Sequence, residues 1–289
     1  MYQKISLLTV LLMVVQCGAG RADEAFPPHR IAGNLYYVGS RDISSYLVTT
    51  PKGHIIINSG FEETVPLIRA AVEGLGFKVR DVRVLLASHA HADHVAGHAR
   101  LQEMTQAKVC VMQGDDSVVR SGGAGQYLYV SSRWPACAVH RVLQDGDQVE
   151  LGGTTLTGRR TAGHTRGCTT WTLQVKHADQ ELDAVIVGSP NVNPGYQLVG
   201  NRDYRKIAVD YASGFAVLRK LKCDLFLGAH GKYYGLREKY PRLKDGTSNP
   251  FIDPDGYRAY ITEREQNYHR ILMEQRKAAA AEQGAGLQR

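Results

Sequence analysis

The chain has 289 residues, a formal net charge of +7 and a hydrophobic content of 43%. This length suits one layered α/β or barrel domain, so size alone does not require two domains. The excess of Lys and Arg is modest and is spread along the chain without basic blocks. Composition therefore makes no case for nucleic acid binding.

The N-terminus has the three-part layout of a secretory signal peptide. Lys4 precedes an uncharged run over 5–20 that is rich in Leu and Val, and small residues follow. The run is short for a membrane span. We therefore expect a signal peptide over residues 1–22, with cleavage after Ala19 or Ala22 both compatible with the pattern.

We expect the exported chain to be a single domain over residues 23–289, located in the periplasm. Removing residues 1–22 removes two basic residues and no acidic one, which leaves a net charge of +5. Cys17 loosely resembles a lipid-attachment site, but Gln16 fits poorly where a small residue is usual. No second long apolar run follows, so we expect a soluble mature protein without stable membrane association. We also expect a monomer.

Short β-rich runs and helical stretches alternate in both halves of the chain. We expect strands at 35–39, 45–50, 54–58, 82–87, 108–112, 154–160, 169–175, 183–188 and 224–229. We expect helices from Val65 to about Gly76, from His94 to about Gln106, over roughly 204–221, and over roughly 257–281, with the alanine-rich end at 278–281 frayed. This interleaving favours an α/β fold in which sheets lie between helices.

The segment 121–135 is rich in Gly and also carries Tyr127, Tyr129 and Trp134. It is not a phosphate-binding loop, because the strand–GxxxxGK[ST]–helix context is missing. Two interpretations stay open: an aromatic-lined loop beside a functional site, or a packed surface loop.

The stretch SHAHADHVAG at 88–97 gathers four metal-ligand side chains directly after an apolar strand. In HxHxDH, His89 and His91 are two apart on an extended segment or tight loop and point the same way, while Asp93 and His94 turn toward a neighbouring position. One short segment can then serve two metal ions. A solvated, histidine-rich loop is the alternative, but loops at strand ends commonly carry chemistry.

Two further histidines occupy similar places. TAGHTRG presents His164 and LFLGAHG presents His230, each near Gly at the end of an apolar segment. Small neighbours let the backbone approach a crowded site, so both become candidate ligands beside HxHxDH. We interpret the remaining histidines as core or surface residues: His29, His54, His98, His140, His177 and His269. His98, four residues after His94, also fits a role in supporting the metal ligands.

Together these motifs resemble the metallo-β-lactamase superfamily, and more narrowly the class B metallo-β-lactamases of subclass B3. The resemblance runs from NLYYVGSRDISSYLVTTPKGHIIINSG through SHAHADH, GHTRGCTTW and GSPNVNPGYQL to CDLFLGAH. It implies a four-layer αβ/βα sandwich with the site at the sheet edges, and two Zn²⁺ ions. The first zinc would be held by His89, His91 and His164, and the second by Asp93, His94 and His230.

The segment VIVGSPNV discriminates among reactions within the superfamily. Many of its other hydrolases carry a metal-bridging aspartate after the glycine, and subclass B1 carries a cysteine ligand there. Here Gly188 is followed by Ser189, and His94 also matches the B3 pattern. Cys168 lies beyond the His164 loop at the start of a strand, so we do not expect it to bind metal.

The resemblance implies hydrolysis of the β-lactam amide in penicillins, cephalosporins and carbapenems. Zinc held by three histidines keeps an open position and brings the pKa of bound water to about 7. Asp93 would orient the water and shuttle a proton. Ser189 would bind the substrate carboxylate, with Asn193 as the next candidate, and Tyr196 could donate to the carbonyl oxygen. For Asn193 and Tyr196 a structural turn is the alternative.

The leading alternative is a dizinc lactonase or thioesterase of the same superfamily. A serine acylation mechanism is disfavoured because no SxxK motif with its partner motifs occurs. A zinc-storage protein is disfavoured because the ligands come from three separate segments.

Four cysteines remain after export, and an oxidising compartment would allow up to two disulfides among Cys110, Cys137, Cys168 and Cys223. Many B3 relatives pair the cysteine corresponding to Cys223 with one nearer the C-terminus. No cysteine follows Cys223 here, so that bridge is expected to be absent or rerouted.

Overall fold

The computed structural model describes residues 24–246 and 248–286. The expected signal peptide over 1–22 lies outside the described residues. Among the described residues, no helix combines the length and apolar character that a membrane span requires.

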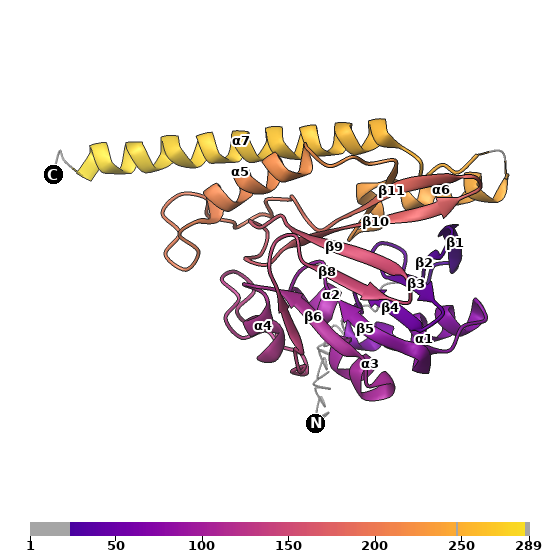
Figure 1. The fold of residues 1–289 in the computed structure, drawn as a ribbon. Coiled ribbons are helices and arrows are strands. Elements are labelled where there is room, and N and C mark those ends of the chain that lie inside the picture. Colours follow the sequence, from indigo (N-terminus) through magenta and orange to yellow (C-terminus); the bar gives the residue numbers. More distant parts are fainter. Residues whose placement is uncertain (1–23, 247, 287–289) are drawn as a thin grey trace, which may run out of the picture.

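The described chain forms two sheets that face each other (Figure 1). The first has the strand order β1-β2-β3-β4-β5-β6-β7, with β1 (His29–Ala32), β2 (Leu35–Tyr37), β3 (Tyr46–Thr50), β4 (Gly53–Ile57), β5 (Val82–Leu86), β6 (Lys108–Met112) and β7 (Arg141–Leu143). The second has the order β12-β11-β10-β9-β8, with β12 (Leu225–Gly228), β11 (Gln180–Val187), β10 (Thr169–His177), β9 (Thr154–Arg160) and β8 (Gln148–Leu151). Parallel pairing joins β4 through β7 and also joins β11 to β12.

Helices cover the outer faces of both sheets (Figure 1). The helices are α1 (Val65–Gly74), α2 (Ala92–Val95), α3 (His98–Thr105), α4 (Asp116–Arg120), α5 (Ile207–Leu218), α6 (Leu236–Lys244) and α7 (Pro254–Gly286). Helices α1 and α3 pack on the first sheet, while α5 and α7 pack on the second. The layers therefore follow the expected αβ/βα order, which confirms the predicted fold class.

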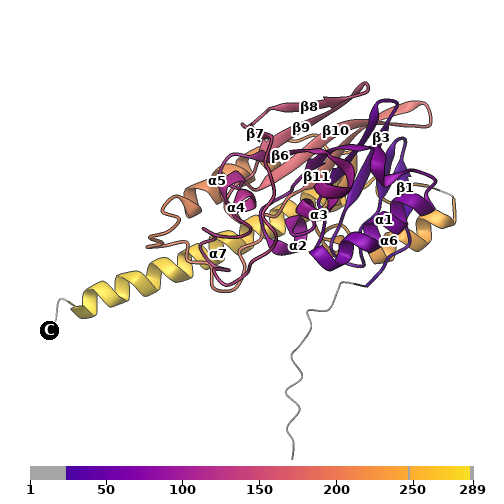
Figure 2. The ribbon, with the colours of Figure 1, turned by 90° about the horizontal axis from the view of Figure 1, so that it is seen from below.

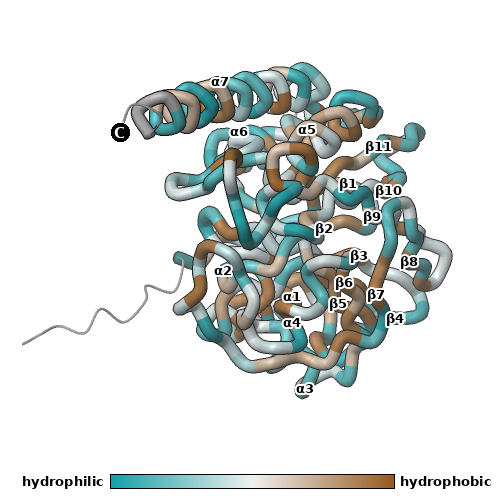
Figure 3. Tube along the Cα trace, turned by 90° about the vertical axis from the view of Figure 1, so that its left-hand side faces the viewer, coloured by the Kyte–Doolittle hydropathy of each residue, from teal (hydrophilic) through white to brown (hydrophobic). Residues whose placement is uncertain are grey.

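The period of two along the strands sorts apolar side chains into two cores. In β4, Ile55 and Ile57 join the core between the sheets, whereas Ile56 joins the core under α1 and α3. Strand β5 repeats the pattern, with Leu85 on the helix side. A strand buried on both faces is apolar on both sides, which explains the unbroken run Ile55 to Ile57. Figure 3 shows such apolar stretches inside the molecule.

The structure corrects the helix that we expected from His94 to Gln106. It is split into α2 and α3, because the His94 carbonyl accepts the Ser59 N–H at 2.8 Å, so main-chain groups at 94 and 97 bond to the 59–60 segment instead of within one continuous helix. A Cβ atom at Gly97 would lie 2.6 Å from the backbone oxygen of Ser59, and the Gly97 N–H donates to the carbonyl of Gly60 at 3.1 Å. This contact brings the β4 end against the metal-ligand segment.

Several short elements were not predicted. Strands β1, β7 and β8 have three or four residues each, and helices α4 and α6 are also short. Such lengths carry little periodic signal. Helix α7 is longer than expected and continues through the alanine run at 278–281, consistent with the high helix propensity of Ala. Its C-terminal end projects beyond the sandwich (Figures 1 and 2).

Candidate metal centre

The ligand segment 88–97 begins at the carboxyl end of β5, where a neighbouring asparagine holds it. Asn58 directly follows β4 and has a left-handed φ of 63°, a conformation that Asn tolerates better than most residues. Its side-chain Oδ1 accepts the Ser88 N–H at 2.7 Å, and its Nδ2 donates to the carbonyl of Ser44 at 3.1 Å. Asn58 was not predicted from the sequence, although a polar residue directly after a buried apolar strand indicates such a role.

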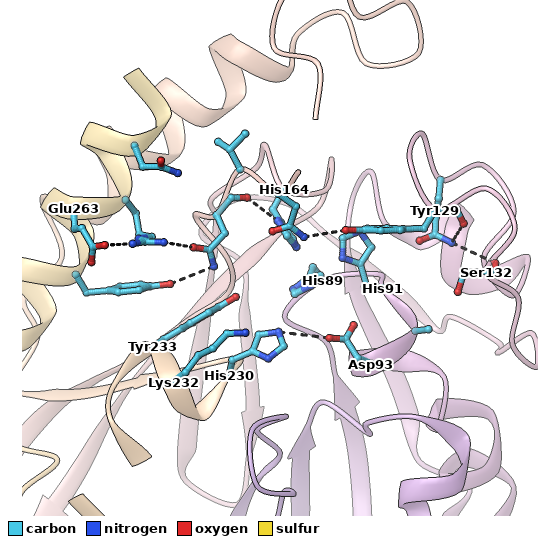
Figure 4. A pocket seen from close by; sticks show the side chains of 18 of the residues that line it. His89, His91, Asp93, Tyr129, Ser132, His164, His230, Lys232, Tyr233 and Glu263 are labelled. Atoms are coloured by element: carbon cyan, nitrogen blue, oxygen red, sulfur yellow. Dashed lines mark hydrogen bonds and ion pairs between the residues drawn. The ribbon is translucent and has the colours of Figure 1, made fainter. Parts of the chain in front are cut away.

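The structure brings His89, His91 and His164 together at the floor of a cavity (Figure 4). One ring nitrogen from each lies within 4.8 Å of the others, and all three side chains are buried. Burial disfavours the charged form, so the pKa values of His89 and His164 are well below the ordinary value and that of His91 is lowered to about 4. The rings are therefore neutral at pH 7, which is the form that binds metal.

Asp93, His94 and His230 form a second cluster beside the first. The His94 Nε2 lies 3.2 Å from the Asp93 Oδ2 and 3.2 Å from the His230 Nε2. The His230 Nε2 lies 3.5 Å from the same carboxylate oxygen. Burial opposes ionisation of Asp93, but the charges of His94 and His230 outweigh it and hold the pKa of Asp93 below its usual range.

Hydrogen bonds on the far side of the rings set which nitrogen faces the cluster. The His164 Nδ1 lies 2.9 Å from the carbonyl oxygen of Asn191, and the His230 Nδ1 lies 3.1 Å from the Asp42 Oδ2. Both oxygens only accept, so each Nδ1 carries the hydrogen and each Nε2 keeps its lone pair for a metal. The donor set of five imidazoles and one carboxylate fits zinc.

Asp42 is a further residue that the sequence analysis missed. Its Oδ1 accepts the N–H of Lys232 as well, so one carboxylate supports the turn that carries His230. Burial raises the pKa of Asp42, but the hydrogen bond and charge of His230 and the contacts with Lys232 lower it to about 2. Asp42 stays ionised near neutral pH.

Asp115 joins the two segments that supply the first cluster. Its Oδ2 accepts the Ala90 N–H at 2.8 Å and the Thr165 hydroxyl at 2.7 Å, and its Oδ1 accepts the Gly167 N–H at 2.8 Å. The side chain is buried, and burial raises its pKa. Asp115 therefore fixes the spacing between the 88–97 segment and the His164 loop.

His98 supports the site from behind. Its Nδ1 lies 2.6 Å from the Ser59 Oγ, and that hydroxyl also lies 3.3 Å from the carbonyl oxygen of His94. Its ring is buried, and the Ser59 hydroxyl connects it to the main chain of His94. The supporting role four residues after His94 is the one that this geometry favours.

A cavity of about 1040 Å³ opens above the two clusters. Tyr129 and Ser132 line one side, so the 121–135 segment borders the site, and Glu263 of α7 lies on the opposite side (Figure 4). The Tyr129 ring meets His91 edge-on, with centroids 4.9 Å apart. Both interpretations of this segment hold in part, because Tyr129 borders the cavity whereas Trp134 packs in the core under α1 and α3.

The three expected substrate-binding residues lie at different depths. Asn193 lines the cavity, and its Nδ2 donates to the Tyr129 hydroxyl at 3.0 Å. Ser189 is only 1% exposed and its Oγ lies 3.1 Å from the Tyr233 hydroxyl, so it sits beneath the lining. The Tyr196 hydroxyl donates to the carbonyl of His164 at 2.8 Å, which turns it away from the cavity.

The four described cysteines are free and buried, so the disulfides that export would allow are not formed: Cys110, Cys137, Cys168 and Cys223. Cys168 joins neither metal cluster. Its Sγ accepts the Ser189 N–H at 3.2 Å, and burial raises the pKa of this thiol to about 12. A neutral thiol is a poor metal ligand.

The comparisons with known proteins agree with this geometry. The family model described as the metallo-beta-lactamase superfamily matches residues 38–177. A probable metallo-hydrolase of Burkholderia pseudomallei is 30% identical over 134 residues, which is 44% of this chain and 43% of that protein. The chain thus spans less than half the length of this curated relative.

Solved structures match over nearly their whole length. The native FEZ-1 metallo-beta-lactamase of Legionella gormanii is 48% identical, with a TM-score of 0.87 over 88% of this chain and 98% of that chain. BJP-1, a subclass B3 metallo-beta-lactamase of Bradyrhizobium japonicum, is 33% identical, with a TM-score of 0.83 over 89% and 97%. The class B3 di-zinc metallo-beta-lactamase LRA-12 from an Alaskan soil metagenome is 30% identical, with a TM-score of 0.82 over 86% and 94%. The chain belongs to the metallo-β-lactamases of subclass B3 and is a hydrolase of that family.

Proposed function

We propose that this protein uses two zinc ions to hydrolyse β-lactam antibiotics in the periplasm and so confers resistance to them. The observation that carries the proposal is the convergence of two adjacent ligand clusters at the floor of one cavity. His89, His91 and His164 would hold the first ion, and Asp93, His94 and His230 the second. Relatives of the same fold include a di-zinc enzyme of subclass B3.

Zinc bound by such ligands supplies hydroxide at neutral pH and polarises a carbonyl. The protein's part is to place the ligands and the proton carrier. Asp93 lines the cavity and keeps an ionised carboxylate at its floor. It would accept a hydrogen bond from the attacking water and carry a proton toward the lactam nitrogen, which is a poor leaving group without one.

Penicillins, cephalosporins and carbapenems are the proposed substrates. The cavity is large enough for a bicyclic lactam with its side chain. A dizinc lactonase or thioesterase is the alternative activity. The residue after Gly188 is the neutral Ser189, so Asp93 is the single anionic side chain in the two clusters and the loaded site would favour an anionic substrate.

Purified protein should be assayed with a penicillin, a cephalosporin and a carbapenem, and in parallel with an acyl-homoserine lactone and a glutathione thioester. The proposal expects lactam cleavage that chelation abolishes and zinc restores, with no effect of inhibitors that acylate serine enzymes. Turnover of the lactone or thioester alone would assign the alternative activity.

A further inference from the structure

Helix α7 supplies one wall of the cavity above the metal clusters. Its residues Tyr260, Glu263, Arg264 and Asn267 line this wall, opposite the 121–135 segment. The helix is held in place nearby, because the Tyr257 hydroxyl donates to the carbonyl of Leu218 at 2.7 Å. The wall is therefore a fixed part of the site.

Arg264 presents a partly exposed guanidinium on this wall. Its Nη1 donates to the Asn191 Oδ1 at 3.2 Å, and its Nη2 pairs with Glu263. The Arg264 side chain is 26% exposed, whereas Glu263 is 65% exposed. Water screens the Glu263 carboxylate, so that carboxylate offsets only part of the Arg264 charge.

Arg264 also decides how Asn191 presents its amide. A guanidinium can only donate, so Asn191 must turn its Oδ1 toward Arg264 and its Nδ2 away from it. The Nδ2 then meets two acceptors, the Tyr260 hydroxyl and the Ser189 Oγ, each at the long distance of 3.4 Å. Both N–H groups of this cavity-lining amide are therefore weakly engaged.

These contacts create a donor pair suited to an anion. Asn191 offers N–H groups and Arg264 offers positive charge, side by side on the same wall. Ser189, the residue expected to bind the substrate carboxylate, is buried and is not among the residues that line the cavity; its Oγ contacts the Asn191 Nδ2 and the Tyr233 hydroxyl. Lys232, a second lining cation, lies 3.6 Å from the Asp42 carboxylate and is partly neutralised by it.

We propose that Asn191 and Arg264 together form the subsite that receives the substrate's carboxylate, with Arg264 as a specificity-determining residue contributed by α7. The inference rests on the proposed lactamase function. Asn191 would donate to the carboxylate, and Arg264 would supply charge and hold the amide in the donating orientation. The wall thus selects acidic lactams over neutral ones.

The test compares a cephalosporin with its neutral methyl ester on zinc-loaded protein. Hydrogen bonds to charged groups are worth about 1.5–3 kcal/mol, so Arg264→Ala should lower kcat/KM for the acid about 10- to 100-fold, mainly through KM. The ester should change less than about twofold, because it lacks the charge. Arg264→Lys should lie between, since it keeps charge but loses the planar fork.

Two further variants keep the inference testable without a large structural change. Glu263→Gln removes the exposed counter-charge and should raise the acid-to-ester ratio of kcat/KM. Arg258→Ala removes an exposed arginine of the same helix that pairs with Asp255, and should leave the ratio unchanged. Added salt should raise KM for the acid in wild type more than in Arg264→Ala.

An acid-to-ester ratio that is the same in wild type, Arg264→Ala and Glu263→Gln overturns the subsite while the lactamase function stands. Equal loss on both substrates together with lost zinc would also overturn it and assign Arg264 a structural role through Asn191 and His164. If wild type cleaves neither compound, the proposed function itself fails, and the inference fails with it.

Discussion

The two metal clusters differ in the group that accepts a hydrogen bond from the histidine lying outside the 88–97 segment, His164 in the first cluster and His230 in the second. His164 of the first cluster bonds to a main-chain carbonyl, that of Asn191, which no side-chain replacement removes. His230 of the second cluster bonds to the Asp42 carboxylate, whose side chain is 38% exposed. The second cluster also contains the carboxylate of Asp93. The first site is therefore built from neutral rings on buried main chain, and the second depends on two acidic side chains.

This difference predicts that the second site can be weakened alone, whereas damage to the first will involve the fold.

Asp93→Asn should have the largest effect. It removes the single anionic side chain in the two clusters and the proposed proton carrier, so kcat for a lactam should fall about 10³-fold, within the range for lost acid–base catalysis. The first cluster should keep its zinc, which metal analysis would show as about one ion per chain. Asp255→Asn, at a 90% exposed side chain, is the control. Two tightly bound ions with unchanged kcat would contradict the contrast.

Asp115→Asn should lower the free energy of unfolding by about 3 kcal/mol, because an amide cannot accept the three hydrogen bonds that this buried carboxylate accepts. Urea denaturation of the metal-free protein measures the change. The neighbouring Asp116 accepts one main-chain N–H, from Gly114 at 3.1 Å, so Asp116→Asn should cost less than about 1 kcal/mol. Equal losses for the two variants would show that Asp115 does not join the loops of the first site.

Asp42→Ala should weaken zinc binding at the second site about 10- to 100-fold, as expected when the carboxylate partner of a metal-bound histidine is lost. The first site should be unaffected. Competition with a chromophoric chelator resolves the two affinities. Simultaneous loss of both ions would mean that Asp42 supports the whole site and that the sites are not separable.

The pH dependence of the metal-free protein should report the buried rings of the first cluster. In the unfolded chain these histidines titrate near 6.5, while in the folded protein burial lowers the pKa of His91 to about 4 and those of His89 and His164 well below 6.5. Between these values the unfolded state binds more protons. Stability is therefore fully present above pH 6.5 and falls as the pH drops toward 4.

Each such histidine contributes up to about 1.4 kcal/mol per pH unit to this slope. His91→Gln should make the slope shallower by up to that amount in urea denaturation between pH 7 and 4.5. His177→Gln, at the end of β10 and outside both metal clusters, is the matched control for the loss of one histidine. An unaltered slope in His91→Gln would show that its burial is not coupled to folding.

The ligand chemistry could be predicted because it is local. HxHxDH places four ligands within six residues, and strand ends next to Gly marked His164 and His230. The long strands could be predicted as well, since a strand buried on both faces of a sheet has an unbroken apolar run such as Ile55 to Ile57. Short elements such as β7, with three residues, lack enough residues to show a period.

The supporting residues could not be predicted because their contacts are distant in the chain. Asp42 meets His230 across 188 positions, and Asp115 meets Gly167 across 52. Each is an ordinary aspartate in its own local context. Similarly, the expected helix is interrupted before His98 because main-chain groups at 94 and 97 bond to Ser59 and Gly60, which belong to another segment.

The amino-acid sequence by itself determined the ligand types, their order and the alternation of strands and helices, because these depend on side-chain chemistry and short-range periodicity. Tertiary structure alone decided the depth of Ser189, the direction of the Tyr196 hydroxyl and the arrival of Arg264 at the cavity. Those outcomes depend on how the second sheet and α7 pack over the first sheet, and packing brings together side chains that have no relation along the chain.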